Sequence, residues 1–300
     1  MLRLPPISTL FPYTALFRSA YTAFVLLARL VRSAAAAMPF AAVLWLVLGA
    51  LDADAAAVAD WLCVDGPSSL PVACVLLVAA AVASLPLSLL GGALLLRFSP
   101  KVPASQFPRW SLRFWWADER MRVLERAGAW LSGTLFWPRW LALAGMRVGR
   151  DVEVSTILDV LPEQTSLGGG SFLADGVYLG GPRVRHGVVE FASTQLGERT
   201  FVGNHVVVEA GQQLPDDLLL GVATVADGRA MPAGSAWFGL PAFRLPRREV
   251  VVADRRLTHE PGALRRANRL FWEGLRFLLP ALPAALALWW FDVVAAADAV

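Results

Sequence analysis

The stretch LGERTFVGNHVVVEAGQQLPDDLLLG, residues 196–221, decides the fold. Aliphatic side chains recur in it at every sixth position: Leu196, Val202, Val208, Leu214 and Leu220. A glycine directly follows the first, second and last of these five residues. A spacing of six fits neither an α-helix nor a single β-strand, whose periods are 3.6 and 2. It fits a parallel β-helix, in which each side of a coil buries one aliphatic side chain and glycine permits the corner.

The same spacing begins further upstream, where the chain carries Val148, Val154, Leu167, Leu173 and Leu179. It is interrupted twice, by 13 residues after Val154 and by 17 residues after Leu179. Each interruption predicts a bulge or a loop between coils. The sequence therefore predicts a parallel β-helix over residues 141–246, and the alternative is an ordinary β-sandwich with glycine turns.

Long apolar stretches flank this region. Residues 33–51 and 66–96 are runs of 19 and 31 residues without a charge, and roughly 20 apolar residues cross a bilayer. We expect an amphipathic lead-in and a two-span membrane hairpin over residues 20–100, with a soluble buried hairpin as the alternative. The uncharged run 277–291 predicts that residues 247–300 hold a basic helix and the start of a further span.

Charges around the spans predict the orientation of the chain. Residues 52–65 carry Asp but no Lys or Arg, whereas residues 97–126 carry seven basic and three acidic residues. The positive-inside rule then puts the β-helix in the cytoplasm of a multi-pass cell-membrane protein. Six tryptophans lie among residues 106–140, which predicts an interfacial region over 101–140. Its helix, 110–132, would lie on the membrane, cover the first coil, or do both.

The net charge and the cysteine content indicate which partners and cofactors to expect. The formal net charge of +3 is small, so we expect membrane lipid and no nucleic acid as a partner. The two cysteines, Cys63 and Cys74, show no metal-ligand spacing, so we expect neither a metal site nor a disulfide framework. Residues 1–19 match nothing else in the chain, and we set them aside as an artefact or a disordered segment.

A series of motifs joins these regions: SLRFWW (111–116), RVGRDVEVST (147–156), LADGVYLGG (173–181), ERTFVGNHVVVEAG (198–211), LLLGVAT (218–224) and SAWFGLPAFRLPRR (235–248). Together with the membrane hairpin, the series resembles the C-terminal membrane region of the Pls/PosA family, the ε-poly-lysine synthetase-like non-ribosomal peptide synthetases. The resemblance covers about residues 33–300. It implies tandem left-handed, hexapeptide-repeat β-helix lobes flanked by transmembrane α-helices. In the family these lobes follow adenylation and carrier domains and are thought to form amide bonds.

The histidines are the candidate catalytic residues, because hexapeptide-repeat acyltransferases commonly use a histidine as general base. His186 lies in the 17-residue interruption, and Glu190 is placed to orient it. His205 lies at a corner of a regular coil beside Asn204, a residue type that tolerates left-handed backbone. His259 lies in the basic tail, where we expect only solvation. The family resemblance does not place the base at either of the first two positions.

Three residues are candidates for cofactor binding: Arg183, Arg185 and Asn204. The two arginines would contact the phosphate of a phosphopantetheine or of coenzyme A. The alternative is a pair of solvated arginines on a loop. Asp175 and Gly176 are most simply a turn.

The resemblance implies a membrane-bound transferase-like module of a non-ribosomal peptide synthetase. It would form amide bonds from amino acids held as thioesters on the phosphopantetheine of a carrier protein domain, or on coenzyme A. One alternative is a structural scaffold lobe that packs with sister β-helix lobes in tandem or as a trimer. Another is a free-standing membrane acyltransferase that uses acyl-CoA. The sequence leaves open whether this lobe is itself an enzyme.

Overall fold

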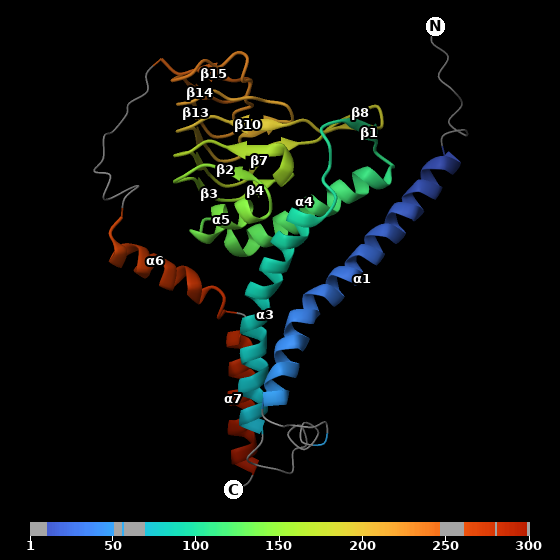
Figure 1. Ribbon diagram of the computed structural model, residues 1–300, viewed down its shortest axis with the longest axis vertical. Helices are drawn as coiled ribbons and strands as arrows, with labels where there is room; N and C mark the ends of the chain where they lie inside the picture. Colours follow the sequence, from blue (N-terminus) through green and yellow to red (C-terminus); the bar gives the residue numbers. More distant parts are fainter. Residues whose placement is uncertain (1–10, 51–55, 57–69, 247–260, 280, 299–300) are drawn as a thin grey trace. The chain divides into compact units, whose positions relative to one another are not determined.

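The computed structural model describes residues 11–50, 56, 70–246, 261–279 and 281–298 (Figure 1). The chain divides into two compact units. The first comprises Met1–Arg29 and Gly92–Pro261, and the second comprises Leu30–Gly91 and Gly262–Val300. The acidic loop 52–65, Cys63 and His259 lie outside the described residues, apart from residue 56.

The second unit is helical. Its segments belong to α1 (Phe11–Ala50), α3 (Leu70–Phe98), α6 (Ala263–Leu275) and α7 (Ala281–Asp298). The stretches Ser19–Leu46 and Val78–Phe98 are long and apolar enough to cross a bilayer. The expected lead-in and first span form the single helix α1, which continues through Pro39.

The coil domain, residues 147–244, belongs to the first unit. Its successive short strands belong to three sheets in turn. Neighbouring strands within each sheet are parallel, except for β14 and β15, which are antiparallel. The first sheet contains β2 (Arg147–Val148), β5 (Thr165–Leu167) and β10 (Thr194–Leu196). The second contains β3 (Glu153–Val154), β6 (Phe172–Leu173), β11 (Phe201–Val202), β13 (Leu219–Leu220), β14 (Ala236–Phe238) and β15 (Phe243–Arg244). The third contains β4 (Ile157–Leu158), β7 (Val177–Gly181) and β12 (Val207–Glu209).

The six-residue spacing fills the interior of the coil domain. All five side chains of the regular run are buried: Leu196, Val202, Val208, Leu214 and Leu220. Val202 pairs with Leu220, 18 positions on, so one full coil is three sixes. The parallel stacking predicted from the spacing is therefore confirmed, and it sets alternate residues of each strand to the interior and the exterior.

The two interruptions take different forms. The 13-residue interruption contains a short 3₁₀ turn, η2 (Pro162–Gln164). The 17-residue interruption is an inserted β-hairpin made of β8 (Arg183–Arg185) and β9 (Val188–Glu190). Strand β1 (Gln106–Pro108) adds to the free side of β9 in antiparallel pairing. The insertion lengthens its coil, because Leu173 pairs with Val202, 29 positions further along the chain.

Two helices cover the first coil. Helix α4 (Leu112–Leu131) begins at the N-cap Ser111, whose hydroxyl accepts a hydrogen bond from the backbone N–H of Phe114 at 3.3 Å. Helix α5 (Phe136–Leu143) contributes Trp137, which is fully buried and donates from Nε1 to the carbonyl of Ser155 at 3.1 Å. Helix α4 contacts β4, and α5 contacts β2 and β3, so both pack on the first coil. The contact of this region with a membrane stays a prediction.

Replacing Val202 by Asp should abolish folding. The carboxylate would enter the interior without a partner, at a cost on the order of several kcal/mol. The matched control is Phe201→Asp, one residue away on the outer face of the same strand and 40% exposed. We expect Val202→Asp to lose folded protein, and Phe201→Asp to melt within a few degrees of the parent in detergent. Equal melting of the two variants would show that the register is wrong.

Candidate functional site

Polar side chains gather at the corner between the second and third sheets. Asp175 and Gly176 form this corner in one coil, and Asn204 and His205 form it in the next. The backbone N–H of His205 donates to the carbonyl of Asp175 at 2.9 Å, so the two corners stack directly. Gly176 and His205 both have positive φ, 68° and 56°. The corner thus needs left-handed backbone, which costs little for glycine and more for histidine.

The ring of His205 lies against Gly176. A Cβ added at Gly176 would stand only 2.5 Å from Nδ1 of His205. The imidazole therefore packs directly on Gly176, where any side chain would displace it. Although its ring is held in this way, His205 is exposed to solvent, so a substrate can reach it.

The carboxylate of Asp175 is the second functional group of this corner. The hydroxyl of Ser155 donates a short hydrogen bond to Oδ1 of Asp175, and the hydroxyl of Thr156 donates to the same atom at 3.3 Å. The hydrogen bond from Ser155 and then those from Thr156 lower the pKa of Asp175, and the positive charge of His205 acts in the same direction. The corner therefore sets an ionised carboxylate beside an accessible imidazole.

Asn204 is occupied within the protein. Its side-chain Oδ1 accepts a hydrogen bond from the backbone N–H of Asp175 at 3.1 Å. The amide thus ties one corner to the next, and its part in binding a cofactor stays a prediction.

His186 lies elsewhere, at the tip of the β8–β9 hairpin with a φ of 48°. It is exposed, and the carbonyl of the following Gly187 accepts from the backbone N–H of Arg109 at 2.8 Å. Glu190 lies opposite Arg183 in the hairpin ladder, away from the tip. The ladder therefore sets Glu190 beside Arg183, and its orienting role toward His186 stays a prediction.

The two arginine candidates differ in their surroundings. Arg183 forms an ion pair with Glu209, with 2.7 Å between Nη2 and Oε2. Arg185 is exposed next to the hairpin tip. Arg185 is therefore accessible to a phosphate, whereas a phosphate would have to compete with Glu209 to bind Arg183.

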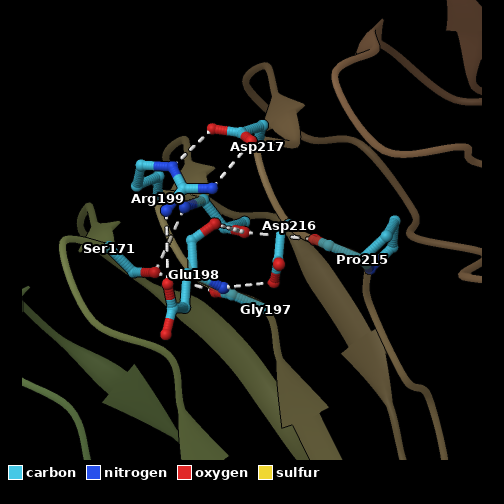
Figure 2. Close-up of polar contacts among 8 residues, drawn as sticks. Ser171, Gly197, Glu198, Arg199, Pro215, Asp216 and Asp217 are labelled. Carbon is cyan, nitrogen blue, oxygen red and sulfur yellow. Dashed lines mark hydrogen bonds and ion pairs between the residues drawn. The ribbon is translucent and has the colours of Figure 1, made fainter.

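The corner between the first and second sheets, which follows β10, carries more charged side chains (Figure 2). Arg199 binds both carboxylate oxygens of Asp217 at 2.8 and 3.0 Å and contacts Glu198 at 3.2 Å. Asp217 raises the pKa of Arg199, so this guanidinium stays charged. The backbone N–H of Glu198 donates to Asp216 at 2.7 Å. These charges satisfy one another, so this corner is a structural clasp.

Asp159 of the coil domain and Glu125 of α4 are neighbouring carboxylates, of which Asp159 is half-buried and Glu125 is exposed. Burial raises the pKa of Asp159, and the negative charge of Asp118 raises it further. Burial also raises the pKa of Glu125, with a further contribution from Asp159. The carboxylates of Asp159 and Glu125 therefore repel each other when both are ionised.

Among the residues that the structure describes, no group of three or more His, Cys, Asp or Glu side chains is arranged to hold a metal ion.

A curated relative is the delta-poly-L-ornithine synthetase of Acinetobacter baumannii (strain AB307-0294). It is 39% identical to this chain over 171 residues, which are 56% of this chain and 13% of the relative. The chain is thus similar to a small part of a poly-amino-acid synthetase, and it spans far less than the relative's whole length. No protein-family model matches the chain.

Similar solved structures are acetyltransferases. A galactoside acetyltransferase in complex with coenzyme A has a TM-score of 0.36 and 15% identity, covering 53% of this chain and 92% of that protein. A maltose O-acetyltransferase from Clostridium difficile 630 has a TM-score of 0.33 and 10% identity, covering 50% and 95%. A hexapeptide-repeat acetyltransferase from Vibrio cholerae has a TM-score of 0.31 and 12% identity, covering 55% and 90%. These TM-scores are too low to define a shared fold.

Replacing Gly176 by Ala tests the contact with His205. The new methyl group would collide with the imidazole and would also strain a positive φ. The matched control is Gly187→Ala, where φ is 77° and nothing lies within 4 Å of the new methyl group. We expect Gly187→Ala to lose about 1 kcal/mol of stability through backbone strain alone. Gly176→Ala should lose clearly more in thermal unfolding, and equal losses would show that the ring does not rest on Gly176.

Replacing Asp159 by Asn should stabilise the protein at high pH. A carboxyl group with a raised pKa loses stability as the pH rises from its unfolded pKa through its folded pKa. Asn removes that ionisation and tolerates the φ of 57°. Partial exposure screens the effect, so the gain at pH 8 should be within about 1 kcal/mol. It should vanish near pH 4 in thermal unfolding. The control, Asp151→Asn, has a φ of 54° but is exposed, and it should show no such gain; a gain at Asp159 that does not vary with pH would refute the ionisation account.

Proposed function

We propose that this chain is a lobe of a poly-amino-acid synthetase-like protein and forms amide bonds by transferring an activated aminoacyl group to an amine. The observation that carries the proposal is the 39% identity over 171 residues to a delta-poly-L-ornithine synthetase. The acceptor is then the amine of a basic amino acid or of its growing chain. The donor is an amino acid held as a thioester on the phosphopantetheine of a carrier domain, as in non-ribosomal peptide synthetases, with coenzyme A as the alternative carrier.

His205 is the general base of this proposal. The amine nitrogen attacks the thioester carbonyl carbon, the new C–N bond forms, and the C–S bond breaks. Nε2 or Nδ1 of His205 accepts the proton lost by the amine and returns it to the departing thiolate. An imidazole suits this task because its unperturbed pKa lies near neutral pH.

Asp175 is the positioning residue. Its ionised carboxylate stabilises the imidazolium form of His205 while the proton is held there. The hydroxyls of Ser155 and Thr156 hold the carboxylate from the preceding coil. The corner thus combines an accessible base with a fixed negative charge.

The proposal also places the lobe at a membrane. The stretches Ser19–Leu46 and Val78–Phe98 have the length and composition of spans. We assign the coil domain to the cytoplasmic side because basic residues dominate after the second span, and we assign it left-handed coiling by its resemblance to hexapeptide-repeat lobes. Aminoacyl thioesters would then reach the corner from the cytoplasm.

A scaffold role is the second candidate, and the outer faces of the coil domain favour it. Phe172 and Phe201 stack on the outer face of the second sheet, with 5.3 Å between ring centroids and 8° between ring planes. They are 38% and 40% exposed. The third sheet carries an outer row of Leu158, Tyr178 and Val207. Two apolar faces therefore flank the His205 corner, which suits packing against sister lobes in tandem or as a trimer.

The experiment uses the purified chain in nanodiscs with an aminoacyl-loaded carrier protein and an amine acceptor, and mass spectrometry measures the amide product. We expect His205→Ala to lower the rate by about 100-fold or more. Asp175→Asn should lower the rate less and shift the pH profile of the rate toward lower pH, since the imidazolium form loses its neighbouring negative charge. His186→Ala should stay near the parent rate.

Each other outcome selects an alternative. Loss of product with His186→Ala but not with His205→Ala would move the base to the hairpin tip. Product only with aminoacyl- or acyl-CoA would favour a free-standing acyltransferase. Absence of product with either donor from the folded chain would leave the lobe a scaffold.

A further inference from the structure

A surface groove lies between the end of α3 and the start of α4. Its volume is about 430 Å³, a size in the usual range for small-molecule sites. Its lining includes the apolar side chains of Pro100, Pro103, Leu112 and Trp116 and the basic side chains of Lys101 and Arg113. An apolar groove bordered by two cations matches a ligand that has both an anionic group and an apolar part.

The groove is held open by contacts that do not involve its two cations. Nε1 of Trp116 donates to the carbonyl of Pro100 at 2.8 Å. The backbone N–H of Val102 donates to Oε1 of Glu163 at 2.9 Å, and Nε2 of Gln164 donates to the carbonyl of Val102 at 2.6 Å. The segment that lines the groove is therefore anchored to α4 and to the coil domain.

The two cations are available to a ligand. Within the described residues, the side chains of Lys101 and Arg113 make no hydrogen bond or ion pair, and both residues are exposed. Arg113 offers a planar fork for two phosphate oxygens, and Lys101 offers a compact positive charge. A phosphate is the anion that this combination recognises best.

The neighbouring apolar side chains indicate where that phosphate comes from. Phe98, at the end of α3, is 80% exposed, and Leu112, at the start of α4, is 71% exposed. Both would be better covered by hydrocarbon than by water. Phe98 also ends the candidate span Val78–Phe98, where a bilayer would present its headgroups.

We propose that this groove binds an anionic phospholipid, with the headgroup phosphate at Lys101 and Arg113 and acyl chain along Leu112 and Phe98. The inference rests on the membrane placement in the proposed function, and it does not depend on the amide-forming activity. It gives the chain a lipid site next to α4, the helix that covers the first coil.

The test measures lipid binding to the full chain purified in detergent. Native mass spectrometry follows titrations with phosphatidylglycerol and with phosphatidylcholine. We expect phosphatidylglycerol to bind at least tenfold more tightly, and Lys101→Ala/Arg113→Ala to remove roughly that preference. The matched control is Arg147→Ala/Arg150→Ala, which removes two exposed cations at the first coil and should keep the preference. Arg113→Glu is a second variant in case the double variant fails to fold, which thermal unfolding would reveal.

Three outcomes would overturn the inference. Equal binding of the two lipids, or equal loss of preference in the control variant, would show that the groove does not select the headgroup. If millimolar glycerol phosphate displaced phosphatidylglycerol, and the acyl chain added nothing to the affinity, the groove would be a site for soluble anions. Recovery of the chain in the soluble fraction of cells would remove the membrane placement as well, whereas loss of lipid selectivity in a membrane-extracted chain would leave the proposed function intact.

Discussion

The first unit depends on the buried ion pair between Arg120 of α4 and Glu163 of the η2 turn. Arg120 is 2% exposed, and its Nε and Nη2 donate to the two carboxylate oxygens of Glu163 at 3.0 and 2.8 Å. The same guanidinium also binds the hydroxyl of Ser99 and, at 3.0 Å, the carbonyl of Leu96. Removing either partner would leave a buried charge alone, which typically costs about 3–5 kcal/mol. One guanidinium thus fixes the end of α3, the covering helix and the first coil.

The coil domain could be predicted because its rule is local and repeated. The six-residue spacing from Leu196 to Leu220 is enough to predict which side chains are buried and that the strands stack in parallel. The hairpin could not be foreseen, since β9 is completed by β1, a strand more than eighty positions earlier. Nor does any spacing reveal that Arg120 pairs with Glu163, because such a pair depends on the three-dimensional meeting of a helix and a turn.

The candidate site was predictable only in part. Asn204 and His205 were expected at a corner, and they lie there. The sequence predicts a simple turn at Asp175 and does not single out Ser155. Both follow buried strand residues, Leu173 and Val154, at the positions where a coil bends. The hairpin insertion hides the alignment of Asp175 with His205, because it separates Leu173 from Val202 by more than one regular coil.

A helix covers one end of the coil domain, and a short antiparallel strand follows the last coil at the other end. Helix α5 packs against β2 and β3 at the beginning, and β15 turns back to pair antiparallel with β14 at the other end. A parallel coil with an open last strand would offer its unpaired N–H and C=O groups to any extended chain. Here the final ladder is taken by the protein's own segment. In the second sheet, this edge of β14 is therefore already paired with Phe243 and Arg244 and is closed to a strand from a second copy of the lobe.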